Sequence, residues 1–290
     1  MKISIEGMGI AAPFGSAVEL KTLLLGETTQ HTPSSSTTAT DALKTFVPPR
    51  KLRRIDHFTR MVLLAAYRAL DDAGSLETLP DNLGIIISTG YGPSQTTFDF
   101  LDSIIEDGAR LASPLAFSHS VHNIPAGVLS LLLGTPCPQT TLCQLKNPVV
   151  AGLQTAALWL AEKRVDNVLF GAVDETTPLL IDTTARLARE QGRDITTPVS
   201  EGATFFLLNN KGRGHTSVEM NRSLADLKGL PLFSHSKSPG APDLRTLFGA
   251  MPTSGALNLA AAALHVQGKN TCAGCCEQDT WLRVSRNPNG

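Results

Sequence analysis

Short apolar runs bounded by glycine recur along this chain, and they restrict its fold more than any other feature. Residues 83–90 (LGIIISTG) and 167–172 (NVLFGA) have the composition of buried strands. Between such runs lie segments with apolar residues at helical spacing, among them 58–70 (FTRMVLLAAYRAL) and 148–162. The alternation predicts an α/β fold whose sheets are covered by helices on both faces.

The same patterns predict the other elements. Further strands are expected at residues 2–6, 138–143, 203–209 and 280–285, and further helices at 17–25, 95–107, 128–133, 179–190 and 255–266. Because glycine and proline favour turns, residues 7–15 are predicted to form a turn. Residues 28–49 and 113–127 (SPLAFSHSVHNIPAG) are predicted to be loops, the second one functional.

Composition excludes several classes of function. Of the 290 residues, 42% are apolar and 18% charged, which is typical of a folded globular protein. A net charge of −1 without blocks of like charge argues against a nucleic-acid groove or a polybasic membrane patch. Since no apolar run reaches about 18 residues and the N-terminus lacks a signal-peptide pattern, we expect a cytoplasmic protein without a membrane span. The odd number of cysteines, five, predicts reduced thiols.

One cysteine stands where reactive cysteines often stand. Cys143 ends the predicted strand 138–143 and precedes the apolar helix 148–162. Backbone N–H groups and the dipole at a helix start favour a thiolate. Cys143 is therefore a candidate nucleophile.

Two segments have partial signatures of cofactor sites, and neither is expected to be one. Gly7, Gly9 and Ala12 satisfy G-x-G-x-x-A after a strand, but no acidic residue follows at the spacing of a dinucleotide site. The cluster CAGCC, with Cys272, Cys275 and Cys276, has only His265 or His235 as a fourth zinc ligand, so a loop of free thiols is favoured. We expect neither a cofactor nor a metal.

The order of the segments resembles the β-ketoacyl synthases, which have the thiolase fold. The resemblance rests on six stretches: residues 2–15, 54–74 (RIDHFTRMVLLAAYRALDDAG), 113–127, 140–143, 165–175 (VDNVLFGAVDE, for the family's A-D-x-x-x-x-G-G-x-D/E) and 194–208, which includes E-G-A. It is specific over residues 1–210 and weak beyond. It implies one thiolase-like domain over residues 1–290, layered α-β-α-β-α with two mixed sheets. The N-terminal half would span about 1–165 and a shortened C-terminal half 166–290.

The chain departs from that family at the residues that carry catalysis. Active synthases follow the cysteine with a glycine-bearing turn, whereas Cys143 is followed by QLKNP, with about three extra residues before the helix. The motif E-A-H-G-T-G-T is absent, and residues 211–245 contain only His215 and His235. In 248–258 (FGAMPTSGALN) Gly249 holds the second histidine's place. Losing both imidazoles removes several kcal/mol of transition-state stabilisation, so condensation is not expected.

A synthase-like chain without these histidines resembles the chain-length factors of type II polyketide systems, including those of aryl polyene pathways. The resemblance implies a heterodimer with an active ketosynthase, a transferase, through the strand 138–143. It further implies an acyl carrier protein that presents a phosphopantetheine-linked acyl chain, in polyketide or fatty acid-like biosynthesis. The candidate residues for the tunnel wall and the interface are Phe117, His119, His122, Asn123, Thr140, Thr141, Leu142 and Gln144, with Phe98, Phe100 and Ile104 as weaker candidates.

Two other functions stay open from the sequence. The chain could be a divergent condensing enzyme or acyltransferase with Cys143 as nucleophile and His119, His122 or His235 as base. It could also carry a small thiol or metal-binding module at its C-terminal end. The sequence leaves open whether Cys143 or Gln144 occupies the nucleophile position.

Overall fold

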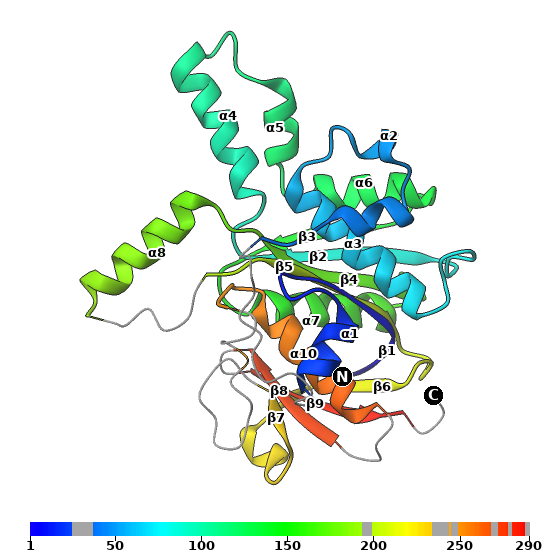
Figure 1. The fold of residues 1–290 in the computed structure, drawn as a ribbon. Coiled ribbons are helices and arrows are strands. Elements are labelled where there is room, and N and C mark those ends of the chain that lie inside the picture. Colours follow the sequence, from blue (N-terminus) through cyan, green and yellow to red (C-terminus); the bar gives the residue numbers. More distant parts are fainter. Residues whose placement is uncertain are drawn as a thin grey trace.

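The computed structural model describes residues 1–24, 37–192, 199–233, 244, 249–267, 272–277 and 280–287. Their strands form one mixed sheet in the order β3-β2-β4-β5-β1-β6-β9-β8-β7 (Figure 1). The strands are β1 (Lys2–Ala11), β2 (Leu83–Thr89), β3 (Gln139–Cys143), β4 (Asn167–Asp174), β5 (Gly202–Asn209), β6 (Thr216–Arg222), β7 (Leu232–Phe233), β8 (Cys272–Glu277) and β9 (Thr280–Arg286). The α-helices are α1 (Ala17–Leu24), α2 (Pro49–Leu52), α3 (His57–Asp72), α4 (Ser94–Asp107), α5 (Pro114–Ser120), α6 (Ile124–Leu133), α7 (Pro148–Ala161), α8 (Pro178–Glu190) and α10 (Ser254–Val266). Two 3₁₀ turns, η1 (Asp41–Thr45) and η2 (Leu224–Leu227), complete the set.

The long first strand joins the two halves of the sheet. Ser4 to Ala11 of β1 pair antiparallel with β5, and Lys2 to Ile5 pair antiparallel with β6. The register shifts between Ile5 and Gly7, and such an irregularity bends a strand and increases its twist. The described strands therefore form one continuous sheet, which corrects the expectation of two separate sheets. The α/β alternation itself is confirmed.

Helices cover the sheet as the alternation predicts. In Figure 1, α3 and α6 lie on one face of the β3-to-β1 part, and α7, α10 and α1 lie on the other. Beyond α10 come β8 and β9, so the described residues give the layers α-β-α-β. On the outer side of β8, a Cβ added at Gly274 would lie 2.8 Å from Leu227 Cδ1 of η2. The resemblance implied a fifth, helical layer outside β8. In the described residues the 3₁₀ turn η2 alone represents this layer.

The turn predicted at residues 7–15 begins later than expected, because β1 continues through both glycines to Ala11. A Cβ added at Gly9 would lie 2.1 Å from the Ala65 carbonyl oxygen and 2.4 Å from the Ala69 nitrogen. Gly7 faces α3 in the same way. The glycines let the α3 backbone lie directly on the strand and do not cradle a phosphate. The dinucleotide alternative is therefore not supported.

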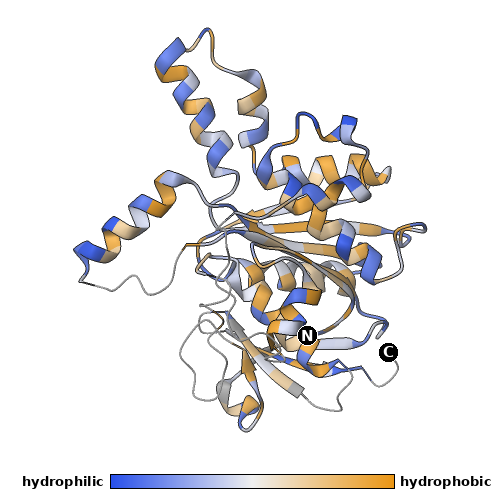
Figure 2. Cartoon of the chain, in the orientation of Figure 1, coloured by the Kyte–Doolittle hydropathy of each residue, from blue (hydrophilic) through white to orange (hydrophobic). Residues whose placement is uncertain are grey.

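The segment 113–127, predicted to be a loop, contains α5 and the start of α6. With α4, α5 forms a hairpin that projects from the body of the molecule, and α8 projects from it in a different direction (Figure 1). None of these three helices has a buried residue. Their apolar side chains alternate with polar ones (Figure 2), and the strongly exposed ones are Leu101, Ile105, Leu115, Phe117, Leu179, Ile181 and Leu187. We call residues 94–120 the arm.

The C-terminal part holds strands that the sequence patterns did not predict. The cysteine cluster expected as a loop lies in β8, where Ala273 and Cys275 are buried in the core that contains α10. The side chains of Cys272 and Cys276, and His235, lie outside the described residues. Elsewhere in the described ranges, no group of three or more potential ligands could hold a metal ion. No described helix combines the length and apolarity needed to cross a membrane.

Candidate functional site

Cys143 ends β3 beside the end of β2, where its Cα pairs with that of Thr89 in parallel register. Its side chain is exposed, and Sγ lies 3.6 Å from the carbonyl oxygen of Gly90. Partial burial and the nearby carboxylate of Asp174 raise the pKa of the Cys143 thiol. A raised pKa keeps the sulfur a thiol at neutral pH, which is the less nucleophilic form.

The residues after Cys143 separate it from the helix that follows. The backbone nitrogen of Gln144 donates to the Thr89 carbonyl (3.0 Å). The side-chain Nε2 of Gln144 donates to the carbonyls of Lys146 and Asn147 (3.0 Å each). Asn147 has a left-handed backbone (φ 53°) and precedes the first residue of α7. The insertion noted in the sequence thus forms a turn of its own. Cys143 does not belong to the first turn of α7.

The first N–H groups of α7 have no partner within the helix, and they donate to a carboxylate on strand β8. Glu277 of β8 accepts from the Val149 nitrogen (3.1 Å) and the Val150 nitrogen (2.7 Å). Its side chain is buried, and burial raises its pKa to about 7 although the two N–H groups act in the opposite direction. Sequence reasoning missed Glu277, because no local pattern links β8 to α7.

A second buried carboxylate organises the strand ends beside Cys143. Asp174 Oδ1 accepts from Thr89 Oγ1 (3.0 Å) and from the backbone nitrogens of Gly90 and Tyr91 (2.9 Å each). Its Oδ2 accepts from the nitrogen (3.1 Å) and the hydroxyl (2.9 Å) of Thr253. Burial raises the pKa of Asp174. One side chain thereby ties the turn after β2 to the loop before α10.

That loop is the segment in which the resemblance puts a lost histidine. A Cβ added at Gly90 would lie 2.3 Å from Pro252, so the loop packs directly on the turn that contacts Cys143. Gly249 is buried and has a left-handed backbone (φ 66°). The loop therefore packs on the turn beside the cysteine, and Gly249 has no side chain that could reach the cysteine.

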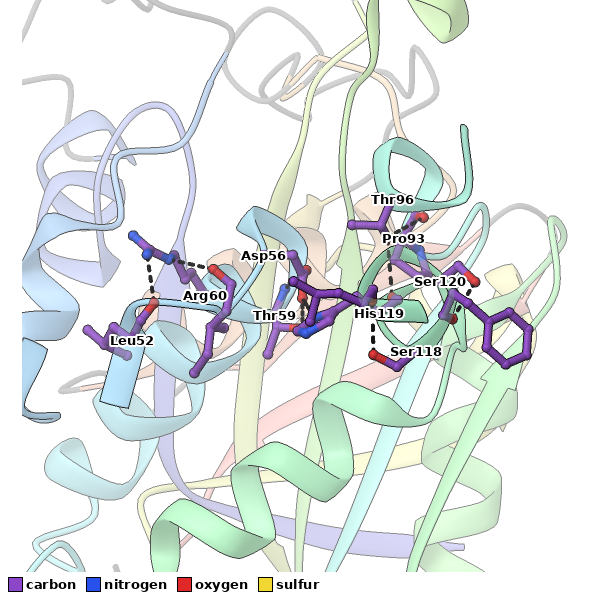
Figure 3. A network of polar contacts seen from close by, with 12 residues as sticks. Leu52, Asp56, Thr59, Arg60, Pro93, Thr96, Ser118, His119 and Ser120 are labelled. Carbon is purple, nitrogen blue, oxygen red and sulfur yellow. Dashed lines mark hydrogen bonds and ion pairs between the residues drawn. The ribbon is translucent and has the colours of Figure 1, made fainter. Parts of the chain in front are cut away.

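The two histidines of residues 113–127 make other contacts. His119 Nδ1 lies 2.6 Å from Asp56 Oδ2, and the His119 carbonyl accepts from Thr96 Oγ1 (3.2 Å). Figure 3 shows His119 and Asp56 pointing toward one another, which links the arm to the start of α3. A Cβ added at Gly92 would lie 2.3 Å from His122 Nε2, so this ring covers the turn after β2. Among the described residues, neither ring is hydrogen-bonded to the cysteine.

Two more buried carboxylates, Glu201 and Glu175, lie close enough to interact near the base of the arm, and Glu175 bonds to the arm itself. Glu201 accepts from His57 Nε2 and from the Thr38 nitrogen (2.7 Å each). Burial would raise the pKa of Glu201, but its hydrogen bonds outweigh burial and hold that pKa below its usual value. The hydrogen bond to Glu201 raises the pKa of His57. Glu175 accepts from the Gln95 nitrogen in the first turn of α4 (2.8 Å), and burial raises its pKa to about 7.

The pH dependence of stability should report on Glu175. A carboxyl whose pKa is raised on folding, here from 4.5 to about 7, stabilises the fold below pH 4.5, and this contribution is lost as the pH rises through 7. Glu175→Gln does not titrate. The difference in the free energy of unfolding between Glu175→Gln and wild type should therefore shift by about 2–3 kcal/mol in favour of the variant from pH 5 to pH 8. Urea denaturation at both pH values measures this shift. A difference that does not change with pH would show that Glu175 titrates normally.

The other interface candidates lie on the surface. Phe117 is 55% exposed and its ring packs on Phe100, with centroids 5.2 Å apart. Asn123 is exposed just before α6. Thr140, Thr141 and Leu142 are half-buried on β3, an edge strand of the described sheet. The structure does not test their roles, which stay predictions.

Comparison with known proteins identifies the family. Residues 27–222 match the sequence profile described as "Beta-ketoacyl synthase, N-terminal domain". The chain belongs to the β-ketoacyl synthase family. It is 27% identical over 195 residues to 3-oxoacyl-[acyl-carrier-protein] synthase 2 of Vibrio cholerae, covering 61% of this chain and 47% of that relative. The corresponding protein of Vibrio harveyi is 26% identical with the same coverage. The chain thus spans about half the length of the curated relatives that it matches.

Solved structures of β-ketoacyl synthase relatives show the same fold. The ishigamide ketosynthase/chain length factor superposes with a TM-score of 0.72 at 14% identity, covering 99% of both chains. A ketosynthase (ApeO) in complex with its chain length factor (ApeC) from Xenorhabdus doucetiae gives a TM-score of 0.64 at 18% identity, covering 99% of this chain and all of that one. The expected thiolase-like fold is confirmed.

Proposed function

We propose that the chain is a non-catalytic, ketosynthase-like chain-length factor that pairs with an active β-ketoacyl-ACP synthase. The observation that carries this proposal is the surroundings of Cys143. In the described residues its sulfur is hydrogen-bonded to a backbone carbonyl and to no imidazole, and the N–H groups of Val149 and Val150 at the start of α7 are bonded to Glu277. Donors aimed at developing negative charge are usually the largest source of catalysis in acyl transfer, and among the described residues no histidine side chain is hydrogen-bonded to this cysteine.

The exposed surfaces suit a protein partner. β3 is an edge strand, and edge strands pair readily with a second chain. The arm and α8 expose apolar side chains that nothing in the described chain covers. We therefore place the active ketosynthase against β3, with Thr140, Thr141, Leu142 and Gln144 at the interface. The names of two structural neighbours, each a ketosynthase with a chain length factor, support this pairing.

The proposal assigns a tunnel-closing role to residues 117–123. Phe117 lies on the exposed side of the arm, while His119 and His122 lie at its base with Asn123. Bulky side chains here would limit the acyl chain that a carrier protein delivers on phosphopantetheine. We assign the complex to the cytoplasm and to polyketide biosynthesis of the type II or aryl polyene kind.

One observation favours a second function. Cys143 is exposed, and the curated relatives are named as synthases. A divergent condensing enzyme or acyltransferase would use this sulfur as its nucleophile. The two functions differ in what the purified chain does alone. An enzyme would move the acyl group of a thioester to Cys143, forming a new thioester there and releasing the donor's thiol.

Co-expression with a candidate ketosynthase tests the proposal. The two chains should co-purify, and Phe117→Ala should lengthen the product measured by mass spectrometry. Leu131→Ala, on an exposed residue of α6 outside the proposed tunnel wall, should leave the length unchanged. Cys143→Ala should leave the amount of product that the complex makes within about twofold, because this cysteine takes no part in the proposed chemistry. A twofold change corresponds to about 0.4 kcal/mol in the barrier. A monomeric chain, or a complex inactivated by Cys143→Ala, would contradict the proposal.

The pairing edge can be tested by backbone chemistry. Ile85 donates to the Pro138 carbonyl and Gln144 donates to the Thr89 carbonyl, so even-numbered residues of β3 bond inward to β2. The N–H of Thr141 therefore faces the open edge. Thr141→Pro should weaken co-purification at least tenfold while the monomer keeps its fold by circular dichroism, because proline removes a donor that only a partner strand would use.

A further inference from the structure

The arm, residues 94–120, holds together through contacts between its own two helices. Helices α4 and α5 pack chiefly on one another, and the rings of Phe100 and Phe117 lie between them with centroids 5.2 Å apart. The nitrogen of Ser113, just before α5, donates to Ser103 Oγ of α4 (3.1 Å). Because these contacts join the two helices to each other, we expect the arm to move as one piece.

The arm meets the start of α3 across a cleft. The cleft has a volume of about 250 Å³, and its lining comes from both sides. Arg54 and Ile55 line it from the α3 side, and Asp99, Leu115 and Ala116 line it from the arm. A close-packed interface would leave no such space. Direct packing therefore contributes little to holding the arm against the start of α3.

A short polar contact bridges the cleft at its edge (Figure 3). His119 Nδ1, on the arm, lies 2.6 Å from Asp56 Oδ2, and the two side chains are 14% and 9% exposed. Asp56 cannot follow the arm, because its carboxylate also accepts from the nitrogen and the hydroxyl of Thr59 (2.8 Å each) and so caps α3. Since α3 is buried along most of its length, the pair joins the arm to a fixed point on the body.

The two links between the arm and the body form a pivot. The link before α4 contains Gly92, whose backbone is left-handed (φ 70°), and residues 121–123 form the link after α5. A Cβ added at Gly92 would lie 2.3 Å from His122 Nε2, so the two links are in contact. Short segments at the ends of helices are where hinge motions occur. The arm is also tied at its first end, where the Gln95 nitrogen donates to Glu175 (2.8 Å).

We propose that the arm is a hinged unit and that the Asp56–His119 pair is the latch that holds it to the body. With the latch closed, both ends of the arm are tied, one at Glu175 and the other at Asp56. With the latch open, the arm is tied at one end and turns about the pivot, into the cleft or away from it. Phe117 lies on the same helix as His119, so the latch also fixes where Phe117 lies. The latch belongs to this chain alone and does not rest on the chain-length-factor role.

Distances between spin labels test the latch. Labels carried by unnatural amino acids at Ile105, on the arm, and at Leu131, on α6, avoid the native cysteines, and both positions are exposed. Wild type should give one narrow distance distribution in double electron–electron resonance. His119→Ala, and Asp56→Ser, which keeps a cap for α3, should raise the population at other distances about tenfold or more, the factor that one hydrogen bond to a charged group contributes. The matched control Ser118→Ala, next to His119 in the same helix, should give the wild-type distribution.

A conservative variant and a second pair of labels distinguish a latch from a contact that only stabilises the fold. His119→Asn keeps a donor in the place of Nδ1 and should restore the narrow distribution. Labels at Ile105 and Leu115, both within the arm, should keep their distance in every variant, because the arm turns as one piece. Unchanged distances between the arm and α6 in both Asp56→Ser and His119→Ala would overturn the proposal. Broadening within the arm, or loss of the body's fold by circular dichroism, would overturn it as well, since the pair would then hold more than the position of the arm.

Discussion

Replacing Gly9 by alanine is expected to lower the free energy of unfolding by about 3 kcal/mol or more, at the upper end of what overpacking costs. The new methyl group would lie 2.1 Å from the carbonyl oxygen of Ala65 and 2.4 Å from the nitrogen of Ala69. Both are backbone atoms of α3, which cannot rotate away as a flexible side chain could. Because α3 is buried along most of its length, the whole helix would have to move off the sheet.

A matched glycine gives the control. Gly127 lies in α6, and a Cβ added there meets no atom within 4 Å. Gly127→Ala should therefore raise the free energy of unfolding by about 0.5–1 kcal/mol, because alanine loses less backbone entropy in a helix. Urea denaturation of the two variants compares them directly. If Gly9→Ala were as stable as Gly127→Ala, α3 would not pack on β1 as closely as the structure shows.

The parts of the fold that the sequence predicts are those whose signal is local. Helix α3 shows apolar residues at helical spacing, and Asp56 caps it by accepting from the Thr59 nitrogen (2.8 Å). The strands β2 and β4 are short apolar runs that are buried throughout. In each case neighbouring residues carry the pattern, so no knowledge of distant partners is needed.

The parts that sequence reasoning missed depend on distant partners. Gly7 and Gly9 indicate a turn by composition, and only the approach of α3 explains why the strand continues through them. Strand β8 contains CAGCC, which is a poor strand pattern, yet pairing with β9 and packing on α10 make it one. Tertiary contacts decide such segments, because β-propensity depends strongly on its surroundings.

The candidate site also contains some features that the sequence predicts locally and others that depend on distant partners. The position of Cys143 at a strand end followed from sequence, whereas the loop with Gly249 was linked to the cysteine only through the family resemblance. The binding of Glu277 to the start of α7 did not follow from sequence, since the two segments are far apart in the chain. The partner of His119 was likewise missed, because its ring is hydrogen-bonded to Asp56, which lies 63 residues earlier in the chain.

Asp174→Ala should have the second large effect, a loss of about 3–5 kcal/mol in the free energy of unfolding. The carboxylate is fully buried and accepts five hydrogen bonds from Thr89, Gly90, Tyr91 and Thr253. Alanine would remove the acceptor of all five donors, four of which are buried.

Asparagine at the same place separates shape from hydrogen bonding. Asp174→Asn keeps one oxygen for the donors on one side but turns an NH₂ toward the donors on the other side, so its loss should fall between those of wild type and Asp174→Ala. Asp182→Ala, at an exposed carboxyl of α8, should stay within about 0.5 kcal/mol of wild type. The Gly90 carbonyl that contacts Cys143 belongs to the turn that Asp174 holds, so alkylation of Cys143 by iodoacetamide should also accelerate in Asp174→Ala. Unchanged stability together with unchanged alkylation would mean that this carboxylate does not organise the strand ends.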